Sequence, residues 1–443
     1  MNQASVRPTN LRWRVLAWMC SLSAITYIGR LSIMQVRENM EGSLGLTPAL
    51  TAYAFSAFSL SYAFFEMPFG WSGDKLGARK ILTRIVWCWI AFTALTGAAW
   101  NLTSLVVFRF LFGAGEAGTF PNISSASRAW FPFRERGYTQ GMVWMFARFG
   151  GAIAPPLMLL VAGGGSGWRM GFLVLSALGL VWVWRFARDF RDTPQQDPRV
   201  NDAELAYIAR GRKEAGKLAP LSWRTMLSSP TLWCLSLMYF GSNAGWSFFA
   251  TWITPYLQKD IHLSGATLAL ASGVPSFFGG FACLLGGLMT DQQVRLLGRR
   301  WGRTLLGVVA YGLGGVFLLI ALVETRDHAG LAFTALCVSF FVKDLGLAPS
   351  WATAIDIGHR YSGTVAGFVN TVGNLAQVVT VPLVAHIATL AGTPGHPNWK
   401  ATLYYYAAMF LMASVSWLFV NPRRVIVYSE EDQRRLRAAG QLE

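Results

Sequence analysis

Long apolar stretches recur along this chain, separated by short polar segments. Each stretch runs for about 18 to 25 residues, the length that an α-helix needs to cross the hydrocarbon core of a bilayer. The pattern therefore predicts an all-α membrane protein with twelve transmembrane helices. These are expected near residues 14–34, 51–70, 81–100, 103–123, 139–161, 169–189, 230–257, 265–289, 303–323, 330–355, 362–388 and 401–420.

A polar stretch divides the predicted helices into two sets of six. We expect an N-terminal half over residues 1–190, a linker over 191–229, and a C-terminal half with a tail over 230–443. A surface helix within the linker is expected to begin near Asn201 or Asp202, both of which are residues that cap helix N-termini.

The two halves look internally related. GWSGDKLGARK, from Gly70, follows the second predicted helix, and GLMTDQQVRLLGRR, from Gly287, follows the eighth. The same combination of glycine, acid and basic residues at equivalent places predicts two pseudo-symmetric halves. In such proteins the substrate site lies near the bilayer midplane, between the halves.

Composition and charge support a membrane protein and give its orientation. Of the 443 residues, 53% are hydrophobic and only 14% are charged, against about 25% charged in soluble domains. The net charge of +16 comes from Lys and Arg in every second loop, as in 75–84, 128–136 and 295–303. This distribution indicates membrane orientation and not nucleic-acid binding, so both termini are predicted to be cytoplasmic.

Enzyme and metal motifs are missing from the sequence. The five cysteines lie within apolar stretches without paired spacing, and no HExxH, GxSxG or P-loop pattern occurs. We therefore expect no catalytic residues, no metal and no cofactor.

The segment FRFLFGAGEAGTFP places two charged residues inside an apolar stretch. Arg109 and Glu116 are seven residues apart and lie on one face of the predicted helix. Charged side chains in membrane spans are costly and usually face a bundle interior or a wet cavity. Moving an organic anion would explain them, and a purely structural pair that sets helix register is the alternative. In the first helix, TYIGRLSIM places Tyr27 and Arg30 on a common face.

These motifs resemble those of a known family. GxxxDKxGxRK after the second helix is similar to the signature loop of the major facilitator superfamily. RFLFGAGEAGTFPN, WFPFRERGYTQG from Trp130, GWRMGFLVLSALGLVW from Gly167 and TWITPYL from Thr251 resemble its anion:cation symporter family. The resemblance implies the two-half fold and movement of organic carboxylates, such as the sugar acids galactonate and hexuronates, by alternating access. We also expect a monomeric carrier, and the short termini favour the bacterial inner membrane as its location.

The resemblance implies a substrate site as well. The arginines that hold the substrate carboxylate in the family match Arg30 and Arg109, and a planar guanidinium suits a carboxylate. Arg30 has an alternative role, in which it reaches the outer membrane interface. Tyr27 and Tyr62 are expected to line the cavity.

In the second half, Asn370 matches a substrate-contacting asparagine of the family. Asn370, Asn374 and Gln377 form a polar stripe that can bind sugar hydroxyls or tie helices together. Trp351 can offer an aromatic wall to the substrate, or mark a membrane interface.

Proton coupling is assigned to carboxylates, because arginine does not titrate. Glu116 is the first candidate, and Glu66 is the second, with a structural hydrogen-bonded role as its alternative. The chain departs from many relatives at Gly29, where they carry an acid, which puts a two-proton mechanism in doubt. Arg148 is expected to pair with Glu116 or Glu66, because an unpaired buried arginine is costly, and a contact for a second anionic group is its alternative role. Lys343 and its neighbour Asp344 are each expected to have partners elsewhere.

Asp74, Arg79 and Asp291 are the expected gating residues. Asp74 and Arg79 can pair across helices in one conformation and separate in another, or they can simply anchor a short loop. The sequence thus predicts a proton-coupled carrier of a small organic anion. A proton-independent uniporter or exchanger is the alternative, and a transporter-like solute receptor is an alternative of another class.

Overall fold

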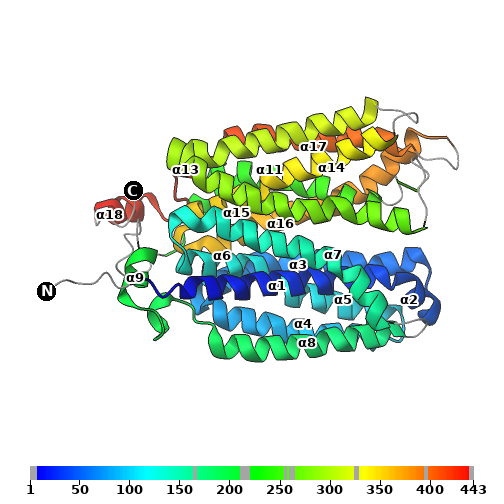
Figure 1. Cartoon of the computed structure of the whole chain (residues 1–443), viewed down its shortest axis with the longest axis horizontal. Coiled ribbons are helices and arrows are strands. Elements are labelled where there is room, and N and C mark those ends of the chain that lie inside the picture. The colour runs from blue at the N-terminus through cyan, green and yellow to red at the C-terminus, as the bar shows by residue number, and fades with distance from the viewer. Residues whose placement is uncertain are drawn as a thin grey trace.

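The protein is helical throughout the part of the chain that the structure describes. The computed structural model describes residues 7–162, 167–209, 220–253, 257–258, 265–323, 329–393 and 398–438. Within these ranges the ordered elements are helices, and no β-strand is present. Figure 1 shows two helical bundles lying side by side, one formed by the first half of the chain and the other by the second.

The first bundle contains six spans. Its helices are α1 (Leu11–Gln35), the short α2 (Arg37–Leu44), α3 (Pro48–Leu76), α4 (Ala78–Gly97), α5 (Leu102–Glu116), α6 (Thr119–Trp130), α7 (Arg136–Ala162) and α8 (Trp168–Asp189). α5 and α6 belong to one span, which is broken at Ala117 and Gly118. Gly118 has a φ of 83°, in the left-handed region that favours glycine.

The second bundle also contains six spans. Its helices are α11 (Pro230–Ser247), the π-helical turn η4 (Phe248–Trp252), α13 (Gly265–Val323), α14 (Ala329–Leu345), α15 (Leu347–Gly358), α16 (Ser362–Leu390) and α17 (Trp399–Leu418). α13 comprises two spans, because the backbone is not helical at Gly298 and the chain folds back there. α14 and α15 form one span interrupted at Gly346. The described residues thus confirm the predicted fold of twelve spans in two sets of six.

Three short helices and both chain ends lie at one end of the bundles, here called the terminal end (Figure 1). They are α9 (Asp202–Ile208), α10 (Trp223–Leu227) and α18 (Glu430–Ala438). The side chain of Asn201 accepts a hydrogen bond of 3.0 Å from the backbone N–H of Glu204, which confirms the predicted cap of the linker helix. Glu204 in turn accepts bonds from the backbone N–H groups of Leu11 (2.9 Å) and Arg12 (3.1 Å), so the linker holds the start of α1.

The repeated motif forms a similar turn in each half. Gly77, between α3 and α4, has a φ of 93°, and Gly298, within α13, has a φ of 76°. Residues with a Cβ are disfavoured at these angles, so a glycine is needed at each turn. The equivalence seen in the sequence therefore holds in the backbone conformation.

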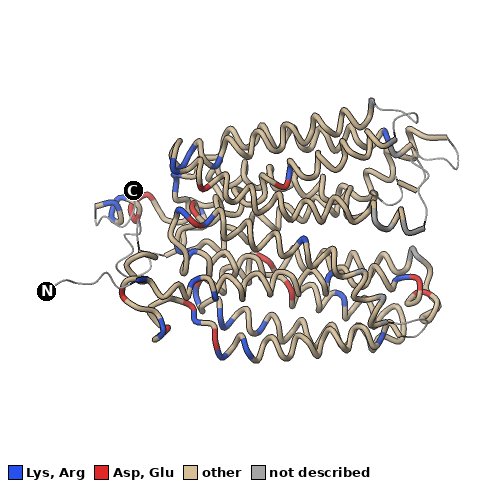
Figure 2. The backbone as a smooth tube through the Cα atoms, viewed as in Figure 1, with Lys and Arg blue, Asp and Glu red and all other residues tan. Residues whose placement is uncertain are grey.

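The outer surface of the bundles is apolar. Large hydrophobic side chains such as Phe64 (71% exposed), Leu160 (81%) and Leu296 (75%) point outward. Such a surface is unfavourable in water and suits lipid. Among the described residues, five helical stretches are long and apolar enough to cross a membrane on length and composition alone, and two of them, Ala271–Leu322 and Gly330–Leu390, are longer than one span. Charged residues gather at the terminal end, with few in the middle of the bundles (Figure 2).

The predicted gating residues lie at the terminal end, where the two halves touch. Asp74 of α3 accepts bonds from the backbone N–H groups of Gly363 (3.0 Å) and Thr364 (2.6 Å), at the start of α16. Arg79 does not contact Asp74. Its backbone N–H donates to Asp192 at 2.7 Å, and its side chain donates to a carbonyl at the end of α8. Pairing of Asp74 with Arg79 in another conformation stays a prediction.

Asp291 makes the equivalent contact from the other half. Its carboxylate accepts bonds from the backbone N–H groups of Gly137 (3.0 Å) and Tyr138 (2.7 Å), at the start of α7. Arg303 donates to Asp291 at 3.1 Å and lies 3.3 Å from Asp356. Asp356 also pairs with Arg136 of the first half at 2.8 Å. The halves are therefore joined at the terminal end by buried charges and capped helices.

Candidate functional site

Arg30, Arg109 and Glu116 meet inside the first bundle, although they come from two helices. Nε of Arg30 on α1 lies 3.4 Å from Oε1 of Glu116 on α5. Arg109 is 2% exposed and Glu116 is 1% exposed. Neither carboxylate oxygen of Glu116 has a hydrogen-bond partner among the described residues, so Arg30 holds it by charge.

Aromatic rings support the two guanidinium groups. The guanidinium carbon of Arg30 lies 4.3 Å from the ring centre of Tyr62 and 5.3 Å from the ring centre of Tyr27. That of Arg109 lies 4.6 Å from the ring centre of Phe112. Ring faces attract cations without using their N–H groups, and Nε and Nη2 of Arg30 and Nε of Arg109 have no hydrogen-bond partner in the described part of the chain. Hydrogen bonds within the described part of the protein therefore do not use these N–H groups.

Small residues bring α5 close to its neighbours. A Cβ at Gly115 would lie 2.9 Å from Cβ of Cys88 on α4. A Cβ at Gly113 would collide with the backbone of α3 at Phe58. The glycines of the segment FRFLFGAGEAGTFP thus permit the close packing that carries Arg109 and Glu116 into the bundle.

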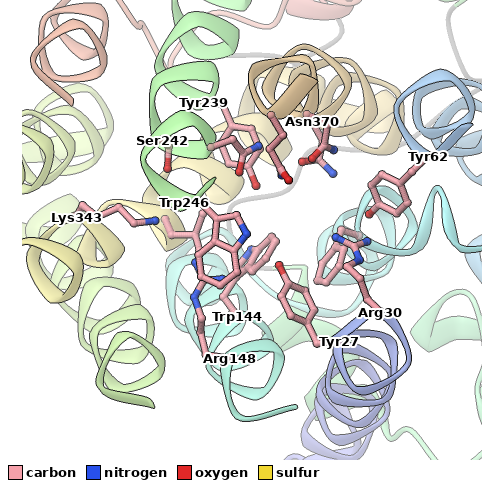
Figure 3. A pocket seen from close by; sticks show the side chains of 15 residues that line it. Tyr27, Arg30, Tyr62, Trp144, Arg148, Tyr239, Ser242, Trp246, Lys343 and Asn370 are labelled. Carbon is pink, nitrogen blue, oxygen red and sulfur yellow. The ribbon is translucent and has the colours of Figure 1, made fainter. Parts of the chain in front are cut away.

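Two adjoining cavities open between the halves, beside these arginines. The central cavity is lined by both bundles and includes Tyr27, Arg30, Tyr62, Arg148, Lys343 and Asn370 (Figure 3). The distal cavity shares Arg30 and Tyr62, adds Arg109, and continues along α1 to Met34. No carboxylate is among the described residues that line either cavity. The walls therefore present cations, aromatic rings and amides, a combination that suits an organic anion.

Trp351 stands behind the wall of the central cavity. It is 3% exposed, and its indole N–H donates to the hydroxyl of Tyr239 at 3.1 Å. Its ring centre lies 5.2 Å from that of Trp144. Tyr239 and Trp144 both line the cavity, so in this structure Trp351 supports the residues that face it. Direct contact of Trp351 with substrate stays a prediction.

Glu66 ties the halves together in this structure. It lies on α3 and is fully buried. The side-chain amides of Asn370 and Asn374 on α16 both donate to its carboxylate, Asn374 at 2.9 Å. Both asparagines also line the central cavity. The two alternatives for the polar stripe therefore coexist here, since the same amides join helices and face the cavity.

A second buried charge cluster corrects the sequence interpretation of Arg148. The structure pairs Arg148 on α7 with Asp344 on α14, through bonds of 2.9 and 3.2 Å, and not with Glu116 or Glu66. Lys343 lies 2.7 Å from the same carboxylate. The expectation that Lys343 pairs away from its neighbour was therefore wrong. The long lysine side chain reaches the carboxylate of the next residue.

Gly29, where the family resemblance leads us to expect an acid, packs against a side chain of another helix. A Cβ at this position would lie 2.7 Å from Nε1 and 2.8 Å from Cζ2 of Trp89 on α4. A side chain at position 29 would thus displace the indole. The missing acid and the neighbouring tryptophan form one packing arrangement.

The structure adds residues that sequence reasoning did not assign. Tyr239, Ser242, Asn243 and Trp246 of α11 line the central cavity, together with Trp144 of α7. The sequence signal for them was a set of polar and aromatic residues spaced three or four apart in the apolar stretch from Pro230.

Asp356, which joins Arg136 and Arg303, was also not predicted from the sequence. An acid near the end of a predicted span marked it.

Comparison with known proteins finds relatives along nearly the whole chain. The sequence profile of the Major Facilitator Superfamily matches residues 19–381. The "Probable sulfoacetate transporter SauU" of Cupriavidus necator is 32% identical, over 97% of this chain and 98% of its own length. The "Probable galactarate/D-glucarate transporter GudP" of Bacillus subtilis is 26% identical, over 97% of each chain. The "Hexuronate transporter" of Bacillus subtilis is 26% identical, over 86% of this chain and 88% of its own.

Solved structures share the fold at low sequence identity. The proton:xylose symporter XylE, bound to 6-bromo-6-deoxy-D-glucose, matches with a TM-score of 0.72 and 14% identity, over 96% of this chain and 98% of that chain. A bacterial homologue of the iron transporter ferroportin in an outward-facing state matches with a TM-score of 0.69 and 13% identity, over 91% and 98%. Because the family profile spans most of the chain and relatives match it nearly from end to end, this protein belongs to the Major Facilitator Superfamily and is a multi-pass membrane transporter.

Proposed function

We propose that this protein is a secondary active transporter that moves a small organic anion, of the sugar-acid type, together with protons by alternating access. The observation that carries the proposal is the cation-lined cavity between the two halves, with every nearby carboxylate set behind its wall. Transporters for sugar acids and sulfoacetate among the relatives support an anionic substrate.

Arg30 and Arg109 hold the substrate carboxylate in this proposal. Both line the distal cavity and both keep unused donors, and a guanidinium stays charged at any physiological pH. Tyr27 and Tyr62 keep Arg30 in place through their rings, and Asn370 binds hydroxyl groups of the substrate from the other half.

Glu116 carries the proton. Its carboxylate lies 3.4 Å from Arg30, so an arriving carboxylate competes with it for the same guanidinium. Substrate binding to Arg30 and proton binding to Glu116 therefore become linked. Glu66 is the second candidate, because release of Asn370 and Asn374 from its carboxylate would accompany separation of α3 from α16.

Residues 191–229 connect the two moving halves in this mechanism. The basic residues gathered at the terminal end favour a cytoplasmic location for both termini. Asp74 and Asp291 then close the cytoplasmic side, and the distal cavity leads toward the opposite side. Transport requires these contacts to break and the halves to rock about the central cavity.

A proton-independent uniporter or exchanger is the second candidate, because Gly29 removes one protonatable group. Purified protein in proteoliposomes tests both functions. Symport of galactonate, galactarate or glucuronate makes the external medium more alkaline as the substrate enters, whereas uniport and exchange leave its pH unchanged. Absence of saturable uptake of every sugar acid and of sulfoacetate would overturn the proposed function.

A further inference from the structure

The two buried charge clusters lie at equivalent places in the two halves. Glu116 is the last residue of α5, where the fourth span of the first half breaks at Ala117 and Gly118. Lys343 and Asp344 lie at the end of α14, where the fourth span of the second half is interrupted at Gly346. Interrupted spans of this kind are where transporters place binding groups for charged ligands.

The second cluster has two basic side chains and one carboxylate. Arg148 and Lys343 share the single carboxylate of Asp344, and no other carboxylate within the described ranges forms an ion pair with either of them. Arg148 is 3% exposed and Lys343 is 1% exposed. A buried charge without a counter-charge is strongly unfavourable, so a second anionic group beside Lys343 would stabilise the cluster.

Both clusters face the same cavity from opposite sides. In Figure 3, Lys343 and Arg148 lie on one side, Arg30 and Tyr62 lie on the other, and Tyr27 and Trp144 lie between them. All six side chains line the central cavity. Arg30 belongs to α1 in the first half and Lys343 to α14 in the second. A ligand charged at both ends can therefore bridge the two halves.

We infer that the site is built for a small dianion with an acidic group at each end, one held by Arg30 and Arg109 and the other by Lys343 beside Arg148. The inference rests on the proposed function and adds the substrate's second charge to it. A monoanion satisfies the first cluster and leaves the second without a counter-ion. A dianion gives each cluster a counter-charge and joins the two halves. It thereby favours the closed state through which an alternating-access transporter passes.

Matched pairs of ligands test this in the purified full-length protein. Galactarate and galactonate share a carbon skeleton and differ in that C6 is a carboxylate in the first and a hydroxymethyl group in the second. Titration calorimetry should show galactarate binding about tenfold more tightly or better, the ratio expected from one charge-assisted hydrogen bond. If each ligand binds by itself and the two affinities are equal, the inference is overturned and the proposed function still stands.

Substitutions at Lys343 locate the second group. Lys343→Gln keeps the Arg148–Asp344 pair and should reduce galactarate affinity to that of galactonate in the same variant, and a cooperative thermal unfolding transition reports correct folding. Lys343→Arg should restore the preference. Lys80→Gln, at an exposed lysine of the terminal end, is the matched control and should keep it. A preference for galactarate that survives in Lys343→Gln would overturn the assignment.

Adding chloride distinguishes a site for one dianion from a site for two separate anions. If the second cluster serves an inorganic ion, galactonate with chloride should bind as tightly as galactarate, and this result would overturn the inference. Galactonate affinity that is the same in the presence and in the absence of chloride supports it. Failure of both sugar acids and of sulfoacetate to bind would instead count against the proposed function itself.

Discussion

Asp74 and Asp291 each cap the start of a helix in the opposite half of the protein. Asp74 binds the first backbone N–H groups of α16, and Asp291 binds those of α7. A carboxylate at a helix N-terminus is stabilised by the unpaired N–H groups and by the helix dipole. The pair therefore forms a pseudo-symmetric lock that holds the terminal end closed.

Neutralising this lock should open the terminal end. We expect Asp74→Asn and Asp291→Asn each to shift the equilibrium between the closed and the open terminal end by about 1–2 kcal/mol toward the open state. An amide keeps the shape of the carboxylate but loses its charge-assisted hydrogen bonds. Cys283 reports the change, since its carbonyl lies against Gly141 of α7 and its side chain is fully buried. Alkylation of Cys283, followed by mass spectrometry, should become faster in both variants.

The matched control for that experiment is Asp202→Asn. Asp202 also lies in the first turn of a helix, but it is exposed and belongs to the linker helix α9. Cys283 labelling should stay at the wild-type rate in this variant. Equal acceleration in all three variants would show that the effect is general loosening and not release of a lock between the halves.

Arg109→Ala should abolish anion binding while preserving the fold. Among the described residues Arg109 forms no ion pair, so its removal leaves no carboxylate without a partner. Thermal unfolding should begin close to the wild-type temperature, while sugar acids should no longer raise it. Arg109→Lys keeps the charge but loses the planar fork and should recover only part of the response. A full ligand-induced shift in Arg109→Ala would contradict the assignment.

Arg30→Ala should behave differently, because it leaves the buried carboxylate of Glu116 without its counter-charge. Breaking a buried pair from one side costs about 3–5 kcal/mol, so the melting temperature should fall clearly. Adding Glu116→Gln should restore most of the lost stability, since the double variant buries no unpaired charge. A double variant as unstable as Arg30→Ala would mean that Glu116 is not ionised against Arg30.

Glu116→Gln alone should separate substrate movement from the proton gradient. Glutamine keeps the size of the side chain and cannot carry a proton. Counterflow of labelled substrate should persist in proteoliposomes, whereas accumulation driven by an inward pH gradient should be lost. Glu66→Gln provides the comparison: loss of accumulation there, with normal accumulation in Glu116→Gln, would move the coupling role to Glu66.

Gly29→Asp should destabilise the first bundle. The new Cβ would lie 2.7 Å from Nε1 of Trp89, and overpacking of this kind costs about 1–3 kcal/mol. The same substitution should cost less in a Trp89→Ala background, because the smaller side chain makes room, although Trp89→Ala itself lowers stability. Melting temperatures of the two variants and of Trp89→Ala alone decide this. An unaltered melting temperature in Gly29→Asp would show that the indole moves freely.

The linker should detach from the first helix in acid. Burial opposes ionisation of Glu204, but hydrogen bonds from Thr9, Leu11 and Arg12 prevail and hold its pKa below the usual value. The ionised contact therefore adds stability above about pH 4.3 and loses it as the pH falls through the lowered pKa. The stability difference between wild type and Glu204→Gln should shrink over that range, as measured by thermal unfolding at several pH values.

Local patterns were sufficient for the fold and for one half of the site. Apolar stretches of the right length determine the spans, because lipid accepts only helices whose backbone bonds are internal. Arg30, Arg109 and Glu116 were identifiable because each lies inside such a stretch, where a charged side chain is costly and usually has a function. The turns at Gly77 and Gly298 could equally be predicted from the sequence, since each turn depends on the backbone angles of its own glycine.

Pairing between helices was decided only by the tertiary structure. No sequence signal assigns Arg148 to Asp344, because their partnership depends on how α7 of one half meets α14 of the other. The same holds for Glu66 with Asn370 and Asn374, and for Trp89 filling the space beside Gly29. Hydropathy and helical periodicity describe one helix at a time, whereas these contacts depend on the packing of residues far apart in the chain.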